Sequence, residues 1–539
     1  WPYWSRSFVA RAIAKGEYAM LIELRPLKRK DSGQIIAPLL SALGQVIADY
    51  HQHPAYQEML RNAHVSFDWI QYKSNFRPAI AERPALGIDA QDVHRRELQI
   101  DLRQVNVETF PDELRRTLDR WKPPASPAEA PHDLPLPAVD GVGEADRAVA
   151  VAARPQTQAL PDIDGDKLYL EPFQPARNSI IWSFNTLYWN ALDKWEATFQ
   201  KGYEAALPGG VTDACNPEFV AESVKHVCEV LDELQRKGQL PDQIFVLEIG
   251  VGNGAQARTW LDAFQRYTSE ARTDYYQRLH YLMSDFSSCV LNAARDAVTP
   301  HLEKVSFLVM DATDPLKSLS FLRYKLMFVH ISNVYDNLPS SELLKWDNKY
   351  YQVEVRAYLP RAEAEKISEQ YGQRNLGVTI TRFLKIGPDY FDDTGEGVHF
   401  WADVWRALKL EERCVLLPEL SQLKLFEGFD GRDAHTLLDQ VSGNVRMHLN
   451  EMALKSFVNT VPLLHPRGFF QVQDIFITEL EQYYSAFRGP GKYDGSVVNW
   501  VNGPLLRLVG NRFGYDVHFQ PFSYRQNSNI IILTTTVRD

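Results

Sequence analysis

Three glycines alternate with other residues directly after a short apolar run that ends in an acid. The stretch is FVLEIGVGNGAQA, residues 245–257, in which Glu248 precedes Gly250, Gly252 and Gly254. Glycines at the end of a strand let the backbone turn tightly and approach a ligand closely, and the following helix presents free N–H groups. This pattern suits a nucleotide-like ligand at the carboxyl edge of a parallel sheet.

Besides a plain packing turn, the stretch fits two kinds of ligand site. Read as G-x-G-x-x-A, residues 250–255 match a dinucleotide site. Glu248 also stands two positions before a G-x-G-x-G run, Gly250 to Gly254. This second pattern matches a site for S-adenosylmethionine (AdoMet), which carries a sulfonium and an ammonium but no phosphate. Because Glu248 would repel a pyrophosphate, the acid favours AdoMet.

Two later apolar runs also end in acids. Asp285 closes LHYLMSD, where a carboxylate can accept hydrogen bonds from both ribose hydroxyls. Asp311 and Ala312 follow VSFLVM, where a side chain and the backbone can read an adenine amino group. We therefore expect the cofactor to contact Glu248, Gly250, Gly252, Gly254, Asp285, Phe286, Asp311 and Ala312.

Strand-like and helix-like runs alternate around these motifs, which predicts βαβ units and a parallel sheet. The last helix is predicted over SVVNWVNGPLLRLVGNRF, residues 496–513. Two strand-like runs close the chain, YDVHFQPFS and SNIIILTTTV, and predict a C-terminal β-hairpin. Such a hairpin is typical of class I methyltransferases and not of simple dinucleotide domains.

The chain resembles the class I AdoMet-dependent methyltransferases in VLEIGVGNG, SDFS, MDA and ISNVYDNLP. More loosely, it resembles the MidA-like group, which includes the mitochondrial complex I assembly-factor methyltransferases. That group has N-E-L-L-D-A-L-P after the fourth strand, of which this chain keeps Asn333, Asp336, Leu338 and Pro339. The resemblance implies an α/β, Rossmann-like seven-stranded sheet. It covers residues 210–539.

The chain departs from the MidA-like pattern at three positions. Val334 and Tyr335 stand where the run has Glu and Leu, and Asn499 stands where the group has a late aspartate. The resemblance therefore implies the fold and the cofactor, but it does not extend to the group's protein-arginine substrate.

Composition predicts four parts of the chain. We expect an N-terminal α+β domain of unknown role at 1–121, a Pro/Ala-rich linker at 122–162, and a methyltransferase domain at 163–339 and 441–539. A large insertion at 340–440 would cover the pocket and select the substrate, and its aromatics either line that pocket or form ordinary core: Phe400, Trp401 and Trp405. The run GPGKYDGSVVNW resembles a glycine-hinged lid.

Asn333 and Asp336 are the predicted catalytic residues, because they follow the fourth strand at the edge that would face the methyl group. Methyl transfer from a sulfonium is an in-line displacement that needs alignment in a water-poor pocket. The Asn333 amide would hold the acceptor, and Asp336 would stabilise a cationic acceptor or take its proton. Alternatively, both residues cap the turn before Pro339. His330, inside an apolar strand, is predicted to be a core residue.

Bulk properties argue against several other classes of function. The net charge of −11 does not suit a protein that binds nucleic acid through phosphates. The four cysteines form no CxxC pair, so we expect no metal site and no disulfide framework. No apolar run approaches the roughly 20 residues that span a bilayer. We expect an intracellular protein, cytoplasmic, or mitochondrial if a transit peptide is missing before Trp1.

The leading hypothesis is an AdoMet-dependent methyltransferase that acts on a protein or another bulky acceptor. A second hypothesis is a methyltransferase-like assembly or interaction protein with weak catalysis. A third is an NAD-dependent oxidoreductase, which Glu248 and the closing hairpin oppose. The N-terminal region is the expected surface for a homo-oligomer or an assembly partner.

Overall fold

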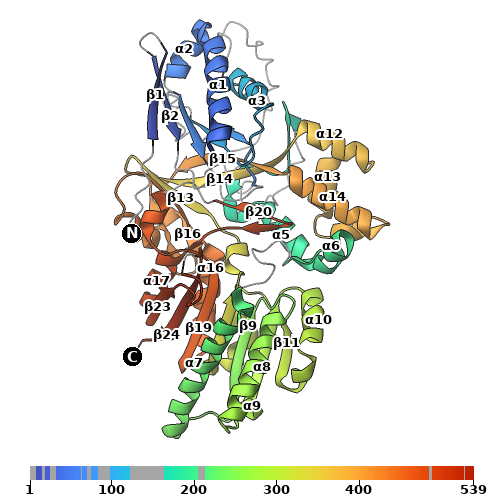
Figure 1. The fold of residues 1–539 in the computed structure, drawn as a ribbon, viewed down its shortest axis with the longest axis vertical. Coiled ribbons are helices and arrows are strands. Elements are labelled where there is room, and N and C mark those ends of the chain that lie inside the picture. Colours follow the sequence, from blue (N-terminus) through green and yellow to red (C-terminus); the bar gives the residue numbers. More distant parts are fainter. Residues whose placement is uncertain are drawn as a thin grey trace, which may run out of the picture.

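The computed structural model consists of three parts stacked along the long axis of the molecule (Figure 1). The N-terminal part lies at one end, the main sheet, which contains the strand before the glycine-rich stretch, lies at the other, and the insertion lies between them. The predicted linker at 122–162 falls outside the described residues. The structure describes residues 8–14, 18–24, 32–61, 63–68, 75–82, 97–121, 163–203, 213–484, 489–526 and 528–538.

The main sheet has eight strands in the order β11-β10-β9-β12-β19-β24-β23, with β22 paired to β19. The five strands β11 to β19 of this order are mutually parallel, whereas β24 runs antiparallel to both β19 and β23. β22 is one strand more than the seven that the sequence predicted. The strands are β9 (Ile244–Ile249), β10 (Leu279–Asp285), β11 (Val305–Val309), β12 (Leu326–Ser332), β19 (Leu464–Ile477), β22 (Val501–Asn502), β23 (Tyr515–Gln520) and β24 (Ile530–Val537).

The strand order reverses between β9 and β12. The chain passes from β9 to β10 and β11, and then crosses to β12 on the other side of β9. Ligands of open α/β sheets bind at the carboxyl ends of the strands at such a switch point. The glycine-rich stretch follows β9 and the run ISNVYDNLP follows β12, so both predicted groups of site residues lie at the switch point.

Helices cover both faces of the main sheet. Successive strand residues point to opposite sides of the sheet, so apolar residues on each side are buried under a separate layer of helices. Val246 belongs to the same buried cluster as Leu261, whereas its neighbour Leu247 belongs to the cluster of Leu454. The first face carries α7 (Pro217–Arg236), α8 (Ala255–Glu270), α9 (Tyr275–Arg278) and α10 (Ser288–Ala297). The second face carries α11 (Pro315–Leu319), α16 (Glu451–Thr460) and α17 (Gly503–Arg512).

The prediction of one helix over 496–513 was wrong for its first half. Residues there form a hairpin, in which β20 (Gly491–Tyr493) pairs with β21 (Ser496–Val498), followed by β22. Helix α17 begins only at Gly503, because the side chain of Asn502 caps it by accepting a hydrogen bond from Leu505 N at 3.0 Å. The valines before the cap favour extended backbone.

The insertion builds a second sheet together with residues outside it. The order is β18-β13-β14-β7-β6, and β15 and β8 also pair with β14. Because β6 to β8 and β18 lie outside 340–440, the predicted boundaries do not coincide with the edges of this sheet. The strands are β6 (Ile163–Asp164), β7 (Lys167–Tyr169), β8 (Gln174–Pro175), β13 (Glu342–Trp346), β14 (Lys349–Pro360), β15 (Lys409–Leu416) and β18 (Val445–His448).

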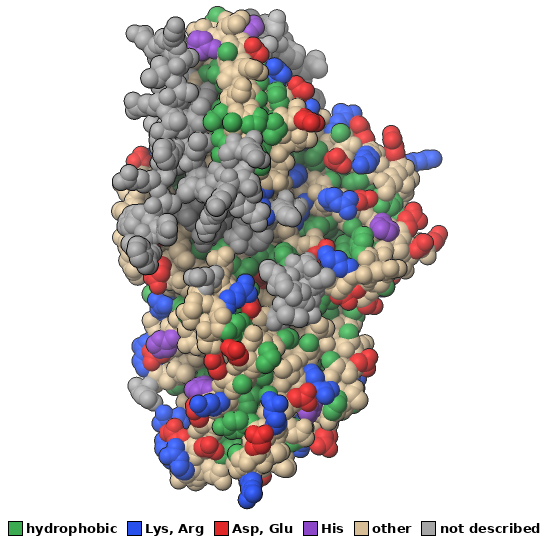
Figure 2. Space-filling model, viewed as in Figure 1, with side chains coloured by type: hydrophobic (Ala, Val, Ile, Leu, Met, Phe, Trp, Pro, Cys, Tyr) green, Lys and Arg blue, Asp and Glu red, His purple; other side chains and the backbone are tan. Residues whose placement is uncertain are grey.

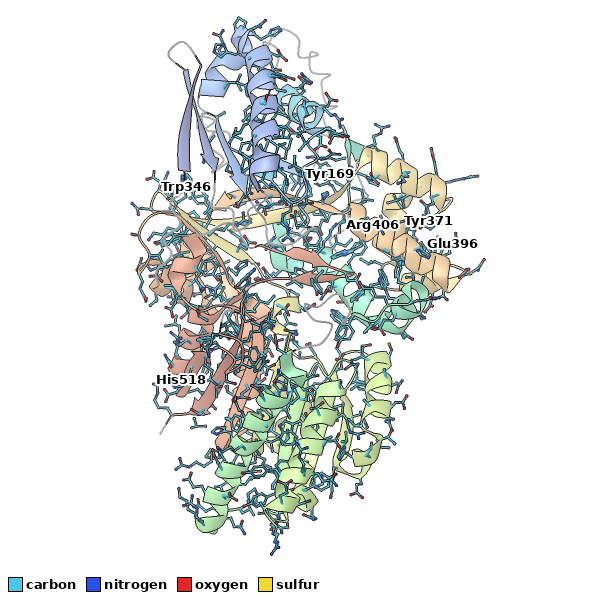
Figure 3. All side chains as sticks on the ribbon, in the orientation of Figure 1. Tyr169, Trp346, Tyr371, Glu396, Arg406 and His518 are labelled. Carbon is cyan, nitrogen blue, oxygen red and sulfur yellow. The ribbon has the colours of Figure 1, made fainter. Side chains whose placement is uncertain are left out.

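Helices of the insertion pack against two helices that precede the main sheet. Tyr371, Glu396 and Arg406 mark the projecting helices in Figure 3. The Phe184 ring of α5 lies 5.9 Å from the Trp401 ring and 5.7 Å from the Trp405 ring of α14. The elements are α5 (Ile181–Asn190), α6 (Leu192–Phe199), α12 (Arg361–Gln370), α13 (Leu376–Phe383), α14 (Thr394–Ala407), β16 (Lys424–Phe426), β17 (Phe429–Asp430) and α15 (Gly431–Leu438).

The N-terminal part has its own sheet and core. The strand order is β1-β2-β3-β5-β4, in which β2, β3 and β5 are parallel. Leu43 of α1, Phe67 of β3 and Leu114 of α3 belong to one buried cluster. The elements are β1 (Phe8–Ala14), β2 (Tyr18–Leu24), α1 (Ser32–His51), α2 (Pro54–Arg61), β3 (His64–Asp68), β4 (Ile80–Glu82), β5 (Glu97–Asp101) and α3 (Phe110–Asp119).

A buried ion cluster joins the N-terminal part to the second sheet. Glu412 of β15 accepts hydrogen bonds from Arg77 at 2.8 Å and from Arg446 of β18 at 2.9 and 3.0 Å. Arg446 also binds Glu342 of β13. Burial alone would raise the pKa of the Glu412 carboxyl, but the two guanidinium groups outweigh it and lower this pKa to about 2.

We predict that Glu412→Gln lowers the free energy of unfolding by about 3–5 kcal/mol, because two buried guanidinium groups lose their shared counter-charge. Chemical denaturation followed by tryptophan fluorescence measures the change. Glu365→Gln is the control, since Glu365 forms an exposed ion pair with Arg361 and its loss is expected to cost under about 1 kcal/mol. Equal effects of the two substitutions would contradict the prediction.

Candidate functional site

The glycine-rich loop after β9 runs where side chains do not fit. Gly250, Gly252 and Gly254 have φ of 79°, 54° and 78°, in the left-handed region that favours glycine. A Cβ on Gly250 would lie 2.3 Å from Val334 Cγ2, and a Cβ on Gly254 would lie 2.8 Å from the Ala294 carbonyl oxygen. The loop therefore offers bare main chain at the end of β9 and at the start of α8.

Asp285, at the end of β10, is tied to this loop. Its carboxylate accepts hydrogen bonds from the N–H groups of Ser287 (3.0 Å), Gly252 and Phe286. Burial raises the pKa of the Asp285 carboxyl to about 6, although these three hydrogen bonds lower it. The carboxylate predicted to bind ribose thus lies beside the glycine loop and is ionised above about pH 6.

Glu248 lies beneath the loop and is sealed from solvent. Its side chain is 2% exposed and accepts a hydrogen bond from the Tyr281 hydroxyl at 2.6 Å. Burial and, to a smaller extent, the nearby Asp285 charge raise the pKa of the Glu248 carboxyl to about 8, against the hydrogen bond from Tyr281. Near neutral pH the Glu248 carboxyl is therefore mostly protonated, so it contributes little of the negative charge that the sequence reasoning assigned to it.

The ends of β10 and β11 bring the other predicted cofactor residues to the same rim. Met310 N donates a hydrogen bond to Asp285 O at 2.9 Å, which fixes the residues after β11 beside the end of β10. Phe286 is 42% exposed, so its ring lies outside the core. Asp311 is exposed, and its carboxylate accepts hydrogen bonds from Thr313 N and the Thr313 hydroxyl, both at 2.8 Å. Ala312 is half-buried.

The turn after β12 carries the predicted catalytic residues. Asn333 has a φ of 51°, a left-handed conformation that asparagine tolerates better than most residues, and its N–H donates to Gln473 O at 2.9 Å. Asp336 is 4% exposed and accepts a hydrogen bond from the Asn337 side chain at 2.8 Å. Val334 lies between Asn333 and Asp336, and its Cγ2 atom lies 2.3 Å from where a Cβ on Gly250 would be. This turn therefore packs directly on the glycine loop.

Asp474 of β19 lies beneath this turn, and the sequence reasoning missed it. Its carboxylate accepts hydrogen bonds from Tyr335 N at 2.9 Å and Asp336 N at 3.2 Å, and also from Ile475 N at 2.7 Å. A further hydrogen bond joins the carboxyl groups of Asp336 and Asp474. An acid inside the apolar strand GFFQVQDIFI was the available signal.

The two carboxyl groups share a buried environment. Burial raises the pKa of Asp336 to about 7, against the hydrogen bonds that it receives. Burial and the charge of Asp336 together raise the pKa of Asp474 well above its ordinary value. Because the two sites titrate together, the pair retains a proton near neutral pH. The Asp336 carboxylate, once ionised, can accept a proton from a bound group.

Helix α5 covers the turn after β12, a contact that the sequence did not indicate. The Asn185 side chain donates to Asn337 O at 3.0 Å and accepts from Val497 N at 2.9 Å. The Trp189 indole N–H donates to the Asn337 side chain at 3.2 Å. Helix α5, which lies between the insertion's helices and the main sheet, therefore covers the turn after β12.

A cavity of about 200 Å³ lies between the glycine loop and the residues that follow α6. A Cβ on Gly252 would lie 2.6 Å from the Tyr203 hydroxyl, so Tyr203 faces the loop. Glu196 is the only charged side chain among the described residues that line the cavity, and it is an acid. The lining residues are Leu192, Glu196, Gly202, Tyr203, Gly252, Asn253, Val290 and Ala293.

The remaining aromatic and histidine candidates are core residues. Phe400, Trp401 and Trp405 are 0%, 0% and 4% exposed and pack within α14 and against α5. His330 is 2% exposed, contacts the Gln256 side chain and stacks on Phe328. Burial lowers the pKa of the His330 imidazole to about 3, so it is neutral at physiological pH. None of these four residues lines the cavity at the glycine loop.

The described surface carries both signs of charge. Figure 2 shows Lys and Arg interspersed with Asp and Glu over the lower part of the face in view. Within the described ranges, no helix has the length and apolar character that crossing a bilayer requires.

No protein-family model matches the chain, and no curated protein matches it either. Solved structures do match. A protein from Burkholderia thailandensis, crystallised with S-adenosyl-homocysteine, is 13% identical over 68% of this chain and 88% of that chain, with a TM-score of 0.41. The CcbJ methyltransferase from Streptomyces caelestis is 11% identical over 59% of this chain and 90% of that chain, with a TM-score of 0.28.

We predict that Gly254→Ala lowers the thermal midpoint more than Gly238→Ala. Both glycines have positive φ, so both substitutions carry a similar backbone strain of about 1 kcal/mol. Only the Gly254 Cβ would meet backbone atoms of Ala294, whereas nothing lies within 4 Å of a Cβ on Gly238. Differential scanning calorimetry measures both midpoints, and equal shifts would contradict the packing described for the loop.

Proposed function

We propose that the chain is an AdoMet-dependent methyltransferase that transfers a methyl group to a protein or another bulky acceptor by in-line displacement. The observation that carries this proposal is the bare glycine loop at the switch point, tied to Asp285 and bordered by an acidic cavity. A diphosphate would need cations or free anion-binding groups there. The lining contains Glu196 and no Lys or Arg among the described residues, which favours a cationic ligand.

The rim residues then have separate tasks in binding. The Asp285 carboxylate accepts hydrogen bonds from the ribose hydroxyls, while its own bonds from the loop hold it in place. Phe286 and Ala312 flank the adenine, and Asp311 reads its amino group. The glycine loop lets the main chain approach the rest of the ligand closely. Glu248 supports the loop from below through its hydrogen bond with Tyr281.

Bound AdoMet supplies an electrophilic methyl carbon: the acceptor atom bonds to this carbon while the carbon–sulfur bond breaks and its electron pair stays on sulfur. The protein's contribution is alignment in a closed pocket. Asn333 orients the acceptor atom through its amide oxygen. Asp336, supported by Asp474, receives the acceptor's proton once it is ionised. The pKa of Asp336, about 7, suits a base that works near neutral pH.

We predict that isothermal titration calorimetry will find AdoMet bound at micromolar Kd and no binding of NAD. Gly252→Arg should abolish AdoMet binding, because its side chain would fill the space between the loop and Tyr203. Gly238→Arg is the control: it places the same side chain on another positive-φ glycine in open space and should keep the wild-type Kd. Binding of NAD, or AdoMet binding retained in Gly252→Arg, would refute the proposal.

The pKa of Asp285 predicts how AdoMet affinity depends on pH. Since the carboxyl titrates at about 6, the carboxylate is present above pH 6 and is lost as pH falls through that value. Affinity should fall by about tenfold or more between pH 7 and pH 5, as charge-assisted hydrogen bonds weaken. Asp285→Asn should bind weakly at both pH values, with little pH dependence. Calorimetry in matched buffers measures this, and a pH-independent wild-type Kd would contradict the assigned role.

A further inference from the structure

Helix α6 and the residues after it form one wall of the cavity at the glycine loop, although they precede the main sheet in the chain. In Figure 1, α6 lies between α14 of the insertion and α10, which covers the main sheet. A ligand seated on the glycine loop is therefore also enclosed by a segment outside the glycine pattern. The cavity-lining residues of this segment are Leu192, Glu196, Gly202 and Tyr203.

Contacts on two sides fix the position of α6. Lys194 Nζ donates to both oxygens of the Asp389 carboxylate at 2.6 Å, which ties α6 to the insertion. On the other side, Leu192 of α6 and Val290 of α10 belong to one buried cluster and both line the cavity. The wall that α6 forms is therefore held at a fixed place over the glycine loop.

Tyr203 connects the Glu196 carboxylate to the glycine loop. The Tyr203 N–H donates a hydrogen bond to Glu196 Oε1 at 2.8 Å, and the Tyr203 hydroxyl lies 2.6 Å from where a Cβ on Gly252 would be. The Trp189 ring packs edge-on against the Tyr203 ring, with centroids 5.6 Å apart, and its indole N–H donates to Asn337. The Glu196 carboxylate and the glycine loop thus lie at the two ends of one tyrosine residue.

The Glu196 carboxylate lacks a counter-charge within the described part of the chain. Its side chain is half-buried, and the hydrogen bond from Tyr203 occupies only part of what a carboxylate can accept. No Lys, Arg or His of the described ranges pairs with it. Removing a carboxylate partly from water without a counter-charge is costly, so a cation bound in the cavity would stabilise it.

The wall opposite Glu196 attracts the other sign of charge. Helix α8 begins at Ala255, directly after the cavity-lining residues Gly252 and Asn253. Its first turn contains no acidic residue, so nothing there offsets the partial positive charge at the N-terminus of this 16-residue helix. The cavity therefore suits a cation at one wall and an anion at the other.

We propose that Glu196 binds the α-ammonium group of AdoMet, while the start of α8 faces the α-carboxylate of the same amino-acid end. This inference rests on the proposed methyltransferase function and deepens it, because it extends the cofactor site beyond the main sheet to α6. An amino-acid group carries both charges a short distance apart, which matches the two walls of the cavity. Glu196 thereby selects AdoMet over nucleosides that lack the ammonium.

The test removes one charge from the protein and one from the ligand. Glu196→Gln removes the negative charge but keeps an Oε1 atom that accepts from the Tyr203 N–H. S-adenosyl-4-thiobutyrate, which is S-adenosyl-homocysteine without its amino group, removes the positive charge. Glu229→Gln is the control, since Glu229 forms an exposed pair with Lys225 on α7 and does not line the cavity. Calorimetry on the full chain measures the Kd of AdoMet and of these two ligands, by competition against S-adenosyl-homocysteine where binding is weak.

In the wild type, loss of the amino group should raise the Kd by about tenfold or more, because a charge-assisted hydrogen bond is lost. Glu196→Gln should weaken AdoMet and S-adenosyl-homocysteine by a similar factor, yet bind S-adenosyl-4-thiobutyrate as the wild type does. The thermal midpoint of the ligand-free Glu196→Gln protein should match the wild type. Glu229→Gln should leave all three Kd values unchanged.

Three results would overturn the assignment of Glu196. An unchanged Kd of S-adenosyl-homocysteine in Glu196→Gln would show that the carboxylate does not bind the ligand, and equal weakening with and without the amino group would indicate a structural role. Weakening of AdoMet alone would place the sulfonium, not the ammonium, at Glu196. A wild type that binds none of the three ligands would remove the proposed function itself, whereas a wild type that binds AdoMet keeps that function in place however Glu196→Gln behaves.

Discussion

The structure of the site depends on the absence of side chains between β9 and α8. At Gly250 and Gly254 a single added carbon would collide with Val334 and with the backbone of Ala294. The loop can therefore touch the turn after β12 on one side and α10 on the other. The ends of three strands meet only because this backbone approach is possible. A bulkier loop would separate Asp285 from the turn after β12.

Carboxyl groups that are buried or half-buried lie around this loop, and each has a different set of partners. Asp285 receives three backbone hydrogen bonds and ionises near pH 6, whereas Glu248 has one tyrosine partner and ionises near pH 8. Asp336 and Asp474 are buried next to each other, and burial raises the pKa of both carboxyl groups. Environments that separate pKa values in this way are typical of sites with acid–base tasks. These pKa values fit the roles proposed for the two ends of the rim, proton acceptance at Asp336 and ribose binding at Asp285.

The appended parts of the chain complete this site rather than form separate modules. The insertion supports α5 through Phe184 and α14, and α5 in turn covers the turn after β12. The N-terminal part fixes β20 through Asn75 and Phe76. Both appended parts are therefore connected to the turn after β12, the insertion through α5 and the N-terminal part through the hairpin β20–β21.

The sequence by itself determined the local features of this protein. The glycine spacing, the acids that end β9 and β10, and the alternation of strands and helices follow from backbone sterics and from side-chain periodicity, which act over a few residues. Only the tertiary structure decided that Asp474 lies beneath Asp336 and that β6 to β8 join the insertion's sheet. These contacts join residues more than a hundred positions apart, and no local pattern encodes which distant strand ends will meet. The helix predicted over 496–513 was wrong over its first half for the same reason, because pairing between β20 and β21 overrides a periodicity that also suits a helix.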